Sequence, residues 1–217
     1  MSIRVSMWNM VALERLIVKA YQQEIFPAAQ EINITSQGVE KLLNGLNPHK
    51  AAGPDAIKPR ILKELSSEIA PILTIIYRKS YETGTIPEVW TKANVTPVYK
   101  KGQKYDAANY RPISLTCVCC KVMEHIITSH IMKHAEEHNI LYPLQHGFRK
   151  GRSCETQLLE FVDDITANMS QGKQTDVLVM DFSKAFDMVS HSLLIHKLDY
   201  YGFVEKQPLT VVAANVT

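Results

Sequence analysis

The chain has 217 residues, of which 46% are hydrophobic and 21% charged, and its formal net charge is +2 at pH 7. This length can bury a core as one domain or as parts of two, and the composition argues against intrinsic disorder. No apolar run approaches the ~20 residues that span a bilayer, and no signal-peptide pattern opens the chain, so we expect an intracellular protein without a membrane span, in the nucleus or the cytoplasm.

Apolar residues at three- and four-residue steps predict helices in the first half of the chain. Alternating valines before the polar stretch Gly102 to Asn109 predict a strand followed by a loop. The predicted elements are a helix capped by Thr35 or Ser36 that ends between Gly45 and Pro48, a turn at Gly53-Pro54-Asp55, two helices from Pro59 to Thr83 that break at Pro71 and stop at Gly84, and a strand from Ala93 to Tyr99.

The second half continues the helical periodicity until the apolar run Val177 to Met180. That run is continuous, which fits a strand covered on both faces, although the pattern alone does not exclude a buried helix. The predicted elements are helices from Lys121 to His138 and from Glu155 to Met169, a strand ending at Asp181, and a helix from Ser190 or His191 through Leu198.

The four cysteines are Cys117, Cys119, Cys120 and Cys154. None forms a CxxC pair, which argues against a zinc ribbon, and three of them crowd too closely for a disulfide framework. We expect these cysteines to be reduced and buried as small hydrophobic residues, in a protein of a reducing compartment.

Basic residues concentrate between Lys92 and Lys121, where six lysines and arginines face one acid, Asp106. The net charge of +2 is too small to predict nucleic-acid binding, so this uneven distribution is the more informative signal. Asp181 carries a second signal, because a carboxylate at the end of a buried strand can hold a metal ion in a cleft. Mg²⁺ requires several oxygen ligands, so Asp181 needs partners from other elements.

Four sequence blocks, in order and with consistent spacing, resemble the reverse transcriptase domain of non-LTR (LINE-like) retrotransposons. The blocks are Lys50–Asp55 leading to Gly84–Trp90 and Val95–Gly102, Asn109–Leu115, Gln145–Ser153, and Asp181–Asp187 with Leu198–Phe203. The resemblance covers residues 32–203 and leaves residues 1–31 and 204–217 unassigned. It implies an α+β fold, a partial right-hand polymerase with fingers and an incomplete palm, helix-rich with a few strands.

The resemblance implies a nucleotide site built around Asp181. In the family this aspartate is catalytic and binds two Mg²⁺ ions, with Mn²⁺ as a possible substitute, and the carbonyl of Phe182 is a further metal ligand. The residues implied to contact the deoxynucleoside triphosphate are Lys100 or Lys101 and Arg111 from the fingers, the backbone amides of Lys184 and Ala185, and Phe186 under the sugar.

A basic loop with two glycines and one aromatic residue is implied to bind the template strand. Its residues are Gln145, Gly147, Phe148, Arg149, Lys150 and Arg152. Glycines let a backbone approach a strand closely, while arginine and lysine neutralise phosphates. An RNA template and a DNA primer follow only from the resemblance, because backbone contacts do not separate RNA from DNA.

Two other patterns resemble catalytic motifs, one of polymerases and one of zinc proteases, but we do not expect either to form a catalytic site. Asp163-Asp164 looks like the paired-aspartate motif of polymerases, but it precedes Asp181 and lies in a helical pattern, where consecutive residues point about 100° apart. His134-Ala135-Glu136-Glu137-His138 matches H-x-x-E-H, a zinc protease signature, within a segment that the family already explains. We expect packed or boundary histidines rather than zinc ligands.

We recognise no motif of the family after Phe203, and its paired aspartates and thumb are expected further along the chain. We therefore expect a truncated reverse transcriptase domain that is inactive alone. The alternative is a non-enzymatic remnant of a retroelement that binds nucleic acid through its basic surface.

Overall fold

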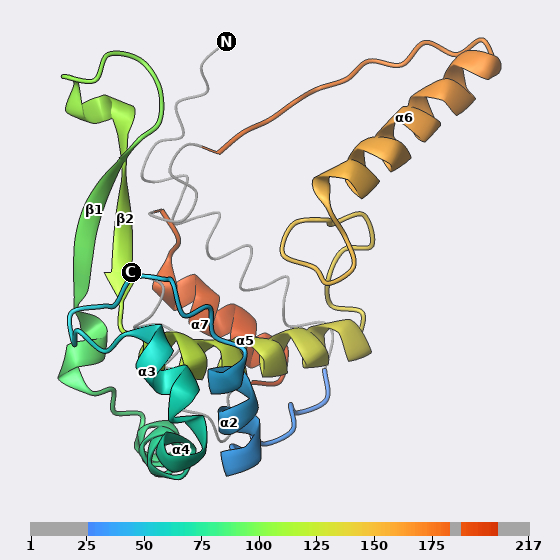
Figure 1. The fold of residues 1–217 in the computed structure, drawn as a ribbon. Coiled ribbons are helices and arrows are strands. Elements are labelled where there is room, and N and C mark those ends of the chain that lie inside the picture. The colour runs from blue at the N-terminus through green and yellow to red at the C-terminus, as the bar shows by residue number, and fades with distance from the viewer. Residues whose placement is uncertain (1–25, 183–187, 204–217) are drawn as a thin grey trace. The chain divides into compact units, whose positions relative to one another are not determined.

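The computed structural model of the protein describes residues 26–182 and 188–203 (Figure 1). This part is helix-rich and contains one two-stranded antiparallel sheet, which confirms the predicted α+β class. Its elements are helices α2 (Ser36–Asn44), α3 (Pro59–Glu64), α4 (Ser66–Thr83), α5 (Val118–Glu137), α6 (Cys154–Ser170) and α7 (His191–Tyr200), 3-10 helices η1 (Glu88–Thr91) and η2 (Ala107–Asn109), and strands β1 (Ala93–Tyr99) and β2 (Tyr110–Thr116).

Contacts divide the chain into two compact units, which are described separately. The first holds the described residues up to His134 together with those from Ser190 onward, and the second holds those between Ala135 and Val189. No helix in either described part is long and apolar enough to cross a membrane.

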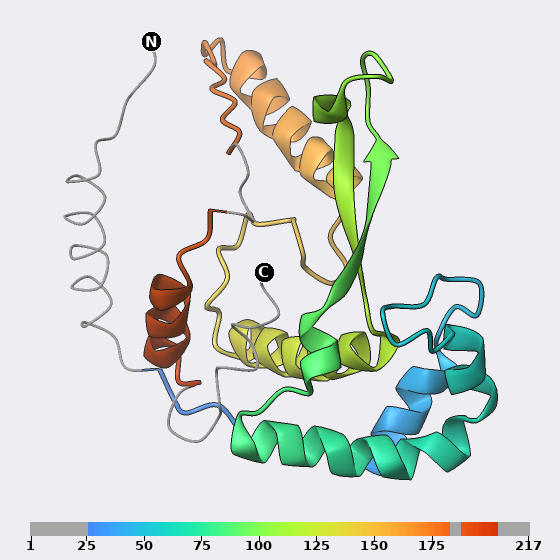
Figure 2. The same cartoon turned by 90° about the vertical axis from the view of Figure 1, so that its left-hand side faces the viewer.

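Helices α2, α3 and α4 pack together in the first unit (Figure 2). Helix α2 begins where predicted, because the Thr35 side chain accepts a hydrogen bond from Gly38 N at 3.1 Å. Its buried residues are Val39 and Leu43. Burial of this apolar face against α4 stabilises a helix that is too short to persist alone.

The predicted break at Pro71 is wrong, because the helices separate at Leu65 and Pro71 lies inside α4. Proline removes one backbone donor, and buried neighbours such as Ala70 keep the helix continuous around it. At the actual break the Ser66 hydroxyl donates to Asn44 Oδ1 at 2.9 Å, which ties the start of α4 to the end of α2.

The core of the first unit surrounds the start of α5, which begins at Val118, before the predicted Lys121. Tyr77 of α4 is fully buried, its ring centroid lies 5.7 Å from that of Trp90, and its hydroxyl donates to the Cys119 carbonyl oxygen at 2.8 Å. These contacts join α4, η1 and α5.

Three cysteines are buried in this core, as predicted. They are Cys117, Cys119 and Cys120. Burial raises the pKa of Cys119 to about 11 and that of Cys120 to about 12. The prediction is wrong for Cys154, which is exposed at the start of α6.

Strands β1 and β2 form a hairpin that leads into α5 (Figure 1). Strand β1 has the predicted bounds, and the following loop contains one 3-10 turn. Pro97 and Pro112 lie opposite each other in the register. Because Lys100 N donates to Asn109 O at 2.8 Å, alternation makes the proline pair a non-hydrogen-bonded one, so neither missing N–H weakens the ladder.

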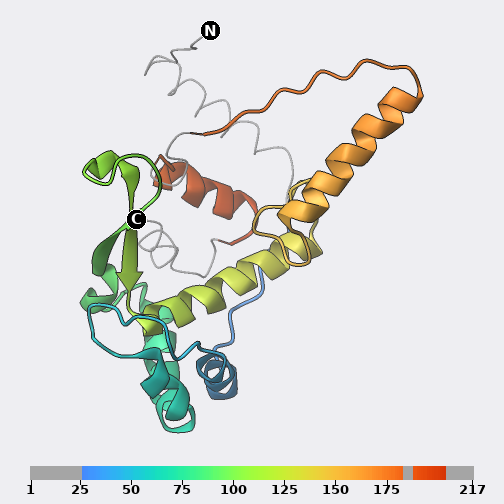
Figure 3. The same cartoon turned by 45° about the horizontal axis from the view of Figure 1, so that its top comes forward.

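The second unit contains α6 and an extended segment after it (Figure 3). Ser153 and Thr156 form a capping box at the start of α6, where each side chain bonds the other's backbone N–H. The predicted buried strand is not observed: Val177 to Met180 have no regular structure and are 51–85% exposed. A strand requires a hydrogen-bonded partner, and within the described residues only β1 and β2 pair.

Candidate functional site

Asp181 lies at the end of the extended segment and is exposed. Among residues 26–182 and 188–203, no group of three or more histidine, cysteine, aspartate or glutamate side chains could hold a metal ion. One carboxylate, with the Phe182 carbonyl beside it, does not supply the several oxygen ligands that Mg²⁺ requires. The other residues predicted around the triphosphate, Lys184, Ala185 and Phe186, lie outside the described residues.

The hairpin resolves which of the two adjacent lysines lies beside Arg111. Lys100 pairs with Asn109 one step beyond the ladder, and Val98 pairs with Arg111. Side chains alternate between the faces of a strand, so Lys100 shares a face with Arg111, whereas Lys101 lies beyond the paired residues, in the bend of the loop. The sequence left these lysines equivalent, because their order along the chain does not define the register.

Two tyrosines on the other face brace the loop of the hairpin, and sequence reasoning missed them. The Tyr99 hydroxyl donates to Gly102 O at 2.6 Å, and the Tyr110 hydroxyl donates to Lys104 O at 2.7 Å. Their rings meet edge to face with centroids 5.7 Å apart, and Lys104 Nζ lies 5.9 Å from the Tyr99 centroid. The signal was available, because the tyrosines flank the polar loop on both sides.

The hairpin concentrates the positive charge of the chain. Residues 93–116 contain four basic residues and one acid, a net charge of +3, whereas the rest of the chain has 20 basic and 21 acidic residues, a net charge of −1. The acid, Asp106, accepts from Ala108 N at 2.9 Å. Within the described residues no carboxylate pairs with Lys100, Lys101 or Arg111. This surface can therefore attract a phosphate group.

Arg149 of the predicted template loop is paired with a glutamate of the same unit. Its Nε and Nη2 atoms donate to the two carboxylate oxygens of Glu136 at 2.9 and 2.6 Å, and Nη1 donates to Tyr142 O at 3.1 Å. The Arg149 side chain is only 14% exposed. Hydrogen bonding to Arg149 lowers the pKa of Glu136.

His146, which was not among the predicted site residues, lies at the centre of the same loop. Its side chain is 3% exposed, with Nδ1 3.0 Å from Thr156 Oγ1 and Nε2 2.9 Å from Glu160 Oε2. Arg152 Nη1 lies 3.2 Å from His146 Nε2 and 3.6 Å from Glu160 Oε1. The loop is thus held against α6 by a buried imidazole and two charged neighbours.

The remaining loop residues point to solvent. Phe148 is 86% exposed at φ +60°, Lys150 is exposed, and no atom would meet a Cβ added to Gly147 within 4 Å. Gln145 Nε2 donates to Gly147 O at 3.1 Å, which closes the turn. An exposed aromatic ring, a lysine and open glycine backbone can approach a nucleic-acid strand.

The structure shows where the residues of the H-x-x-E-H pattern and of the Asp163-Asp164 pair lie. His134 Nε2 donates to Tyr201 O at 2.8 Å, and its ring meets that of Phe203 edge to face, so this histidine is packed. Asp163 and Asp164 lie within α6, as predicted.

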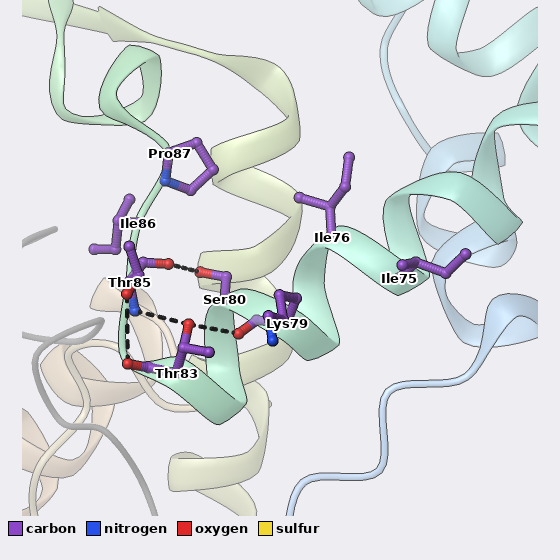
Figure 4. Close-up of a pocket in the computed structure, with 8 residues that line it drawn as sticks. All are labelled: Ile75, Ile76, Lys79, Ser80, Thr83, Thr85, Ile86 and Pro87. Atoms are coloured by element: carbon purple, nitrogen blue, oxygen red, sulfur yellow. Dashed lines mark hydrogen bonds between the residues drawn. The ribbon is translucent and has the colours of Figure 1, made fainter.

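A pocket of about 510 Å³ lies beside α4 (Figure 4). Its lining comes from the second half of α4 and the turn after it: Ile75, Ile76, Lys79, Ser80, Thr83, Thr85, Ile86 and Pro87. The hydroxyls of Ser80 and Thr83 donate to the backbone oxygens of Thr85 and Lys79, both at 2.7 Å. None of the predicted site residues lines this apolar pocket, so it offers no support for the predicted chemistry.

Comparison with known proteins identifies relatives of the chain. The profile of the family described as reverse transcriptase (RNA-dependent DNA polymerase) matches residues 98–214. The chain is 26% identical over 182 residues to the RNA-directed DNA polymerase from mobile element jockey of Drosophila melanogaster, covering 83% of this chain and 20% of that protein.

Two further relatives come from other mobile elements. The probable RNA-directed DNA polymerase from transposon X-element of Drosophila melanogaster is 30% identical over 144 residues, 66% of this chain and 16% of that protein. The Pol polyprotein from type-1 retrotransposable element R2 of Popillia japonica is 29% identical over 124 residues, 56% of this chain and 17% of that protein. The chain thus spans about a fifth of the length of these relatives. The profile match, the mobile-element relatives and the motif order together show that the chain belongs to the reverse transcriptase family and resembles its non-LTR members.

Proposed function

We propose that the chain forms the fingers and first palm segment of an RNA-directed DNA polymerase of a mobile element, which extends a DNA primer on an RNA template. The observation that carries this proposal is the hairpin, where Lys100 and Arg111 share one face and lack carboxylate partners among the described residues. Arginine gives bidentate contact with a phosphate and lysine adds a point charge, so the pair suits an incoming triphosphate.

Two Mg²⁺ ions are the expected cofactors of the complete polymerase. The described residues do not form a site for them, since Asp181 is a single exposed carboxylate. We therefore propose that these 217 residues do not polymerise alone and that other carboxylates must complete the metal site. Primer extension by this chain on an RNA template with Mg²⁺ should not exceed that of Asp181→Ala. Incorporation that depends on Asp181 would refute the proposed inactivity.

Binding of a fluorescent deoxynucleoside triphosphate to this chain tests the nucleotide surface. Lys100→Ala and Arg111→Ala should each weaken binding roughly ten- to a hundredfold, because a hydrogen bond to a charged group contributes about 1.5–3 kcal/mol. Lys101→Ala is the matched control, with the same charge removed from the adjacent residue, in the bend beyond the paired strands. An equal loss in all three variants would show that only net charge matters and would contradict the assignment to one face.

A non-enzymatic nucleic-acid-binding protein is the second candidate. The charge distribution favours it independently of any metal site, because the hairpin carries +3 and the rest of the chain −1. Binding of single-stranded RNA without triphosphate binding would support this function over the first one.

A further inference from the structure

The arginines of the loop Gln145–Ser153 are engaged within the protein. Arg149 uses three of its nitrogen atoms for Glu136 and Tyr142, and it is largely buried. The carboxylate of Glu136 occupies the Nε–Nη2 edge, Nη1 donates to Tyr142 O, and the side chain is only 14% exposed, so little of the guanidinium is left for a phosphate. The geometry therefore gives Arg149 a role inside the protein.

The opposite end of the loop is held by His146 and Arg152. His146 bonds Thr156, which also caps α6, and Glu160 one turn further along the helix. Arg152 lies against both His146 and Glu160. Two carboxylates, Glu136 and Glu160, thus neutralise the two arginines, and the last turn of α5 and the first turns of α6 become the anchors of the loop.

We propose that Arg149, Arg152 and His146 are positioning residues that hold the loop in shape, and that Lys150 is the cation of this loop that contacts nucleic-acid phosphate. This inference rests on the proposed function for the presence of a nucleic acid. It assigns the contact to the one basic side chain between Gln145 and Ser153 that is exposed and that has no carboxylate partner among the described residues.

Reversing the charges of the Arg149–Glu136 pair tests the positioning role. The readouts are the thermal unfolding midpoint and the binding of a fluorescent single-stranded oligouridylate to the full chain. Glu136→Arg makes the chain more positive, so simple attraction predicts tighter RNA binding, whereas loss of the loop anchor predicts weaker binding and a lower midpoint. Arg149→Glu should lower both. The double variant Glu136→Arg with Arg149→Glu restores the pair and should recover most of both losses.

The reversal of Arg60 and Glu64 is the matched control. This ion pair is 2.7 Å long and its side chains are 71% and 61% exposed, so its reversal should change neither readout. Lys150→Ala should leave the unfolding midpoint unchanged. It should make the negative slope of log affinity against log salt shallower by about 0.7, the contribution of one phosphate contact on a single strand.

Three outcomes would overturn the inference in whole or in part. If the double variant regains the wild-type midpoint but not RNA binding, Arg149 contacts the nucleic acid directly. If Lys150→Ala binds RNA with the wild-type salt slope, Lys150 is not the contact. Absence of RNA binding by the wild-type chain would refute the proposed nucleic-acid binding and the Lys150 assignment, while recovery of the midpoint in the double variant would still decide whether Arg149 anchors the loop.

Discussion

Replacing Gly202 by alanine tests the contact that joins the ends of the described first unit. Gly202 has φ +88°, and a Cβ there would overlap the Pro27 carbonyl oxygen. The Gly202 carbonyl accepts a hydrogen bond from Ala29 N at 2.8 Å. Next to it, the Phe26 ring meets Tyr200 and Tyr201 edge to face, with centroids 5.4 and 5.2 Å away.

The expected destabilisation follows from two terms. A side chain in the left-handed region costs about 1–2 kcal/mol, and displacement of the Pro27 segment removes the Ala29 hydrogen bond, which contributes about 1 kcal/mol. The free energy of unfolding should fall by about 2–3 kcal/mol, which lowers the melting temperature by roughly 4–12 °C in a chain of this size. Circular dichroism during heating measures this change.

Gly172→Ala provides the control. Gly172 has φ +67° and nothing within 4 Å of an added Cβ, so this variant carries the backbone strain without the overlap. The Gly172→Ala variant should lower the free energy of unfolding by about 1 kcal/mol. If Gly202→Ala unfolds at the temperature of Gly172→Ala, the close approach of Gly202 to Pro27 is refuted.

Three further predictions concern strained or buried residues. Ala56→Gly should raise the free energy of unfolding by about 0.5–1 kcal/mol in urea titrations, because Ala56 has φ +57° and glycine relieves this strain at a smaller entropic cost; a lower midpoint would contradict this. Tyr77→Phe should lower the free energy of unfolding by about 1–2 kcal/mol, because it removes the hydrogen bond to Cys119 O. The control Tyr105→Phe should leave the free energy of unfolding unchanged, because the Tyr105 side chain is 88% exposed. Of the four thiols only Cys154 should react rapidly with a disulfide reagent at pH 8. The raised pKa values of Cys119 and Cys120 mean that the unfolded chain loses these protons first, so stability is full below the ordinary thiol pKa of 9.0 and falls as the pH rises above it; four rapidly reacting thiols in the folded chain would refute this burial.

Local signals in the sequence predicted the elements whose causes are local. The Thr35 and Ser190 caps, β1 and α6 follow from capping chemistry and hydrophobic periodicity, and the structure confirms them within one residue. The break at Pro71 failed because buried neighbours outweigh one lost hydrogen bond. The strand before Asp181 failed because a strand depends on partners that its own sequence does not specify.

The arrangement of the candidate site depended on pairings that spacing along the chain does not reveal. Motif order identified the hairpin lysines, but only the β1–β2 register separates Lys100 from Lys101. Composition indicated that the loop around Arg149 is basic, but it did not show that Glu136, 13 residues earlier, binds that arginine. Basic residues of one motif can therefore have different roles, which only their partners reveal.

The partners of the basic residues also determine how strongly RNA binding should depend on salt. If Lys150 is the one cation of the loop Gln145–Ser153 that contacts a phosphate of a single strand, the loop contributes about −0.7 to the slope of log affinity against log salt. Contacts from Arg149 and Arg152 as well would bring this contribution to about −2. Because Glu136 and Glu160 already neutralise those arginines, they hold no counterions for RNA to release, and the smaller contribution is expected. A measured contribution near −2 would mean that RNA displaces both glutamates, and the loop would then rearrange on binding.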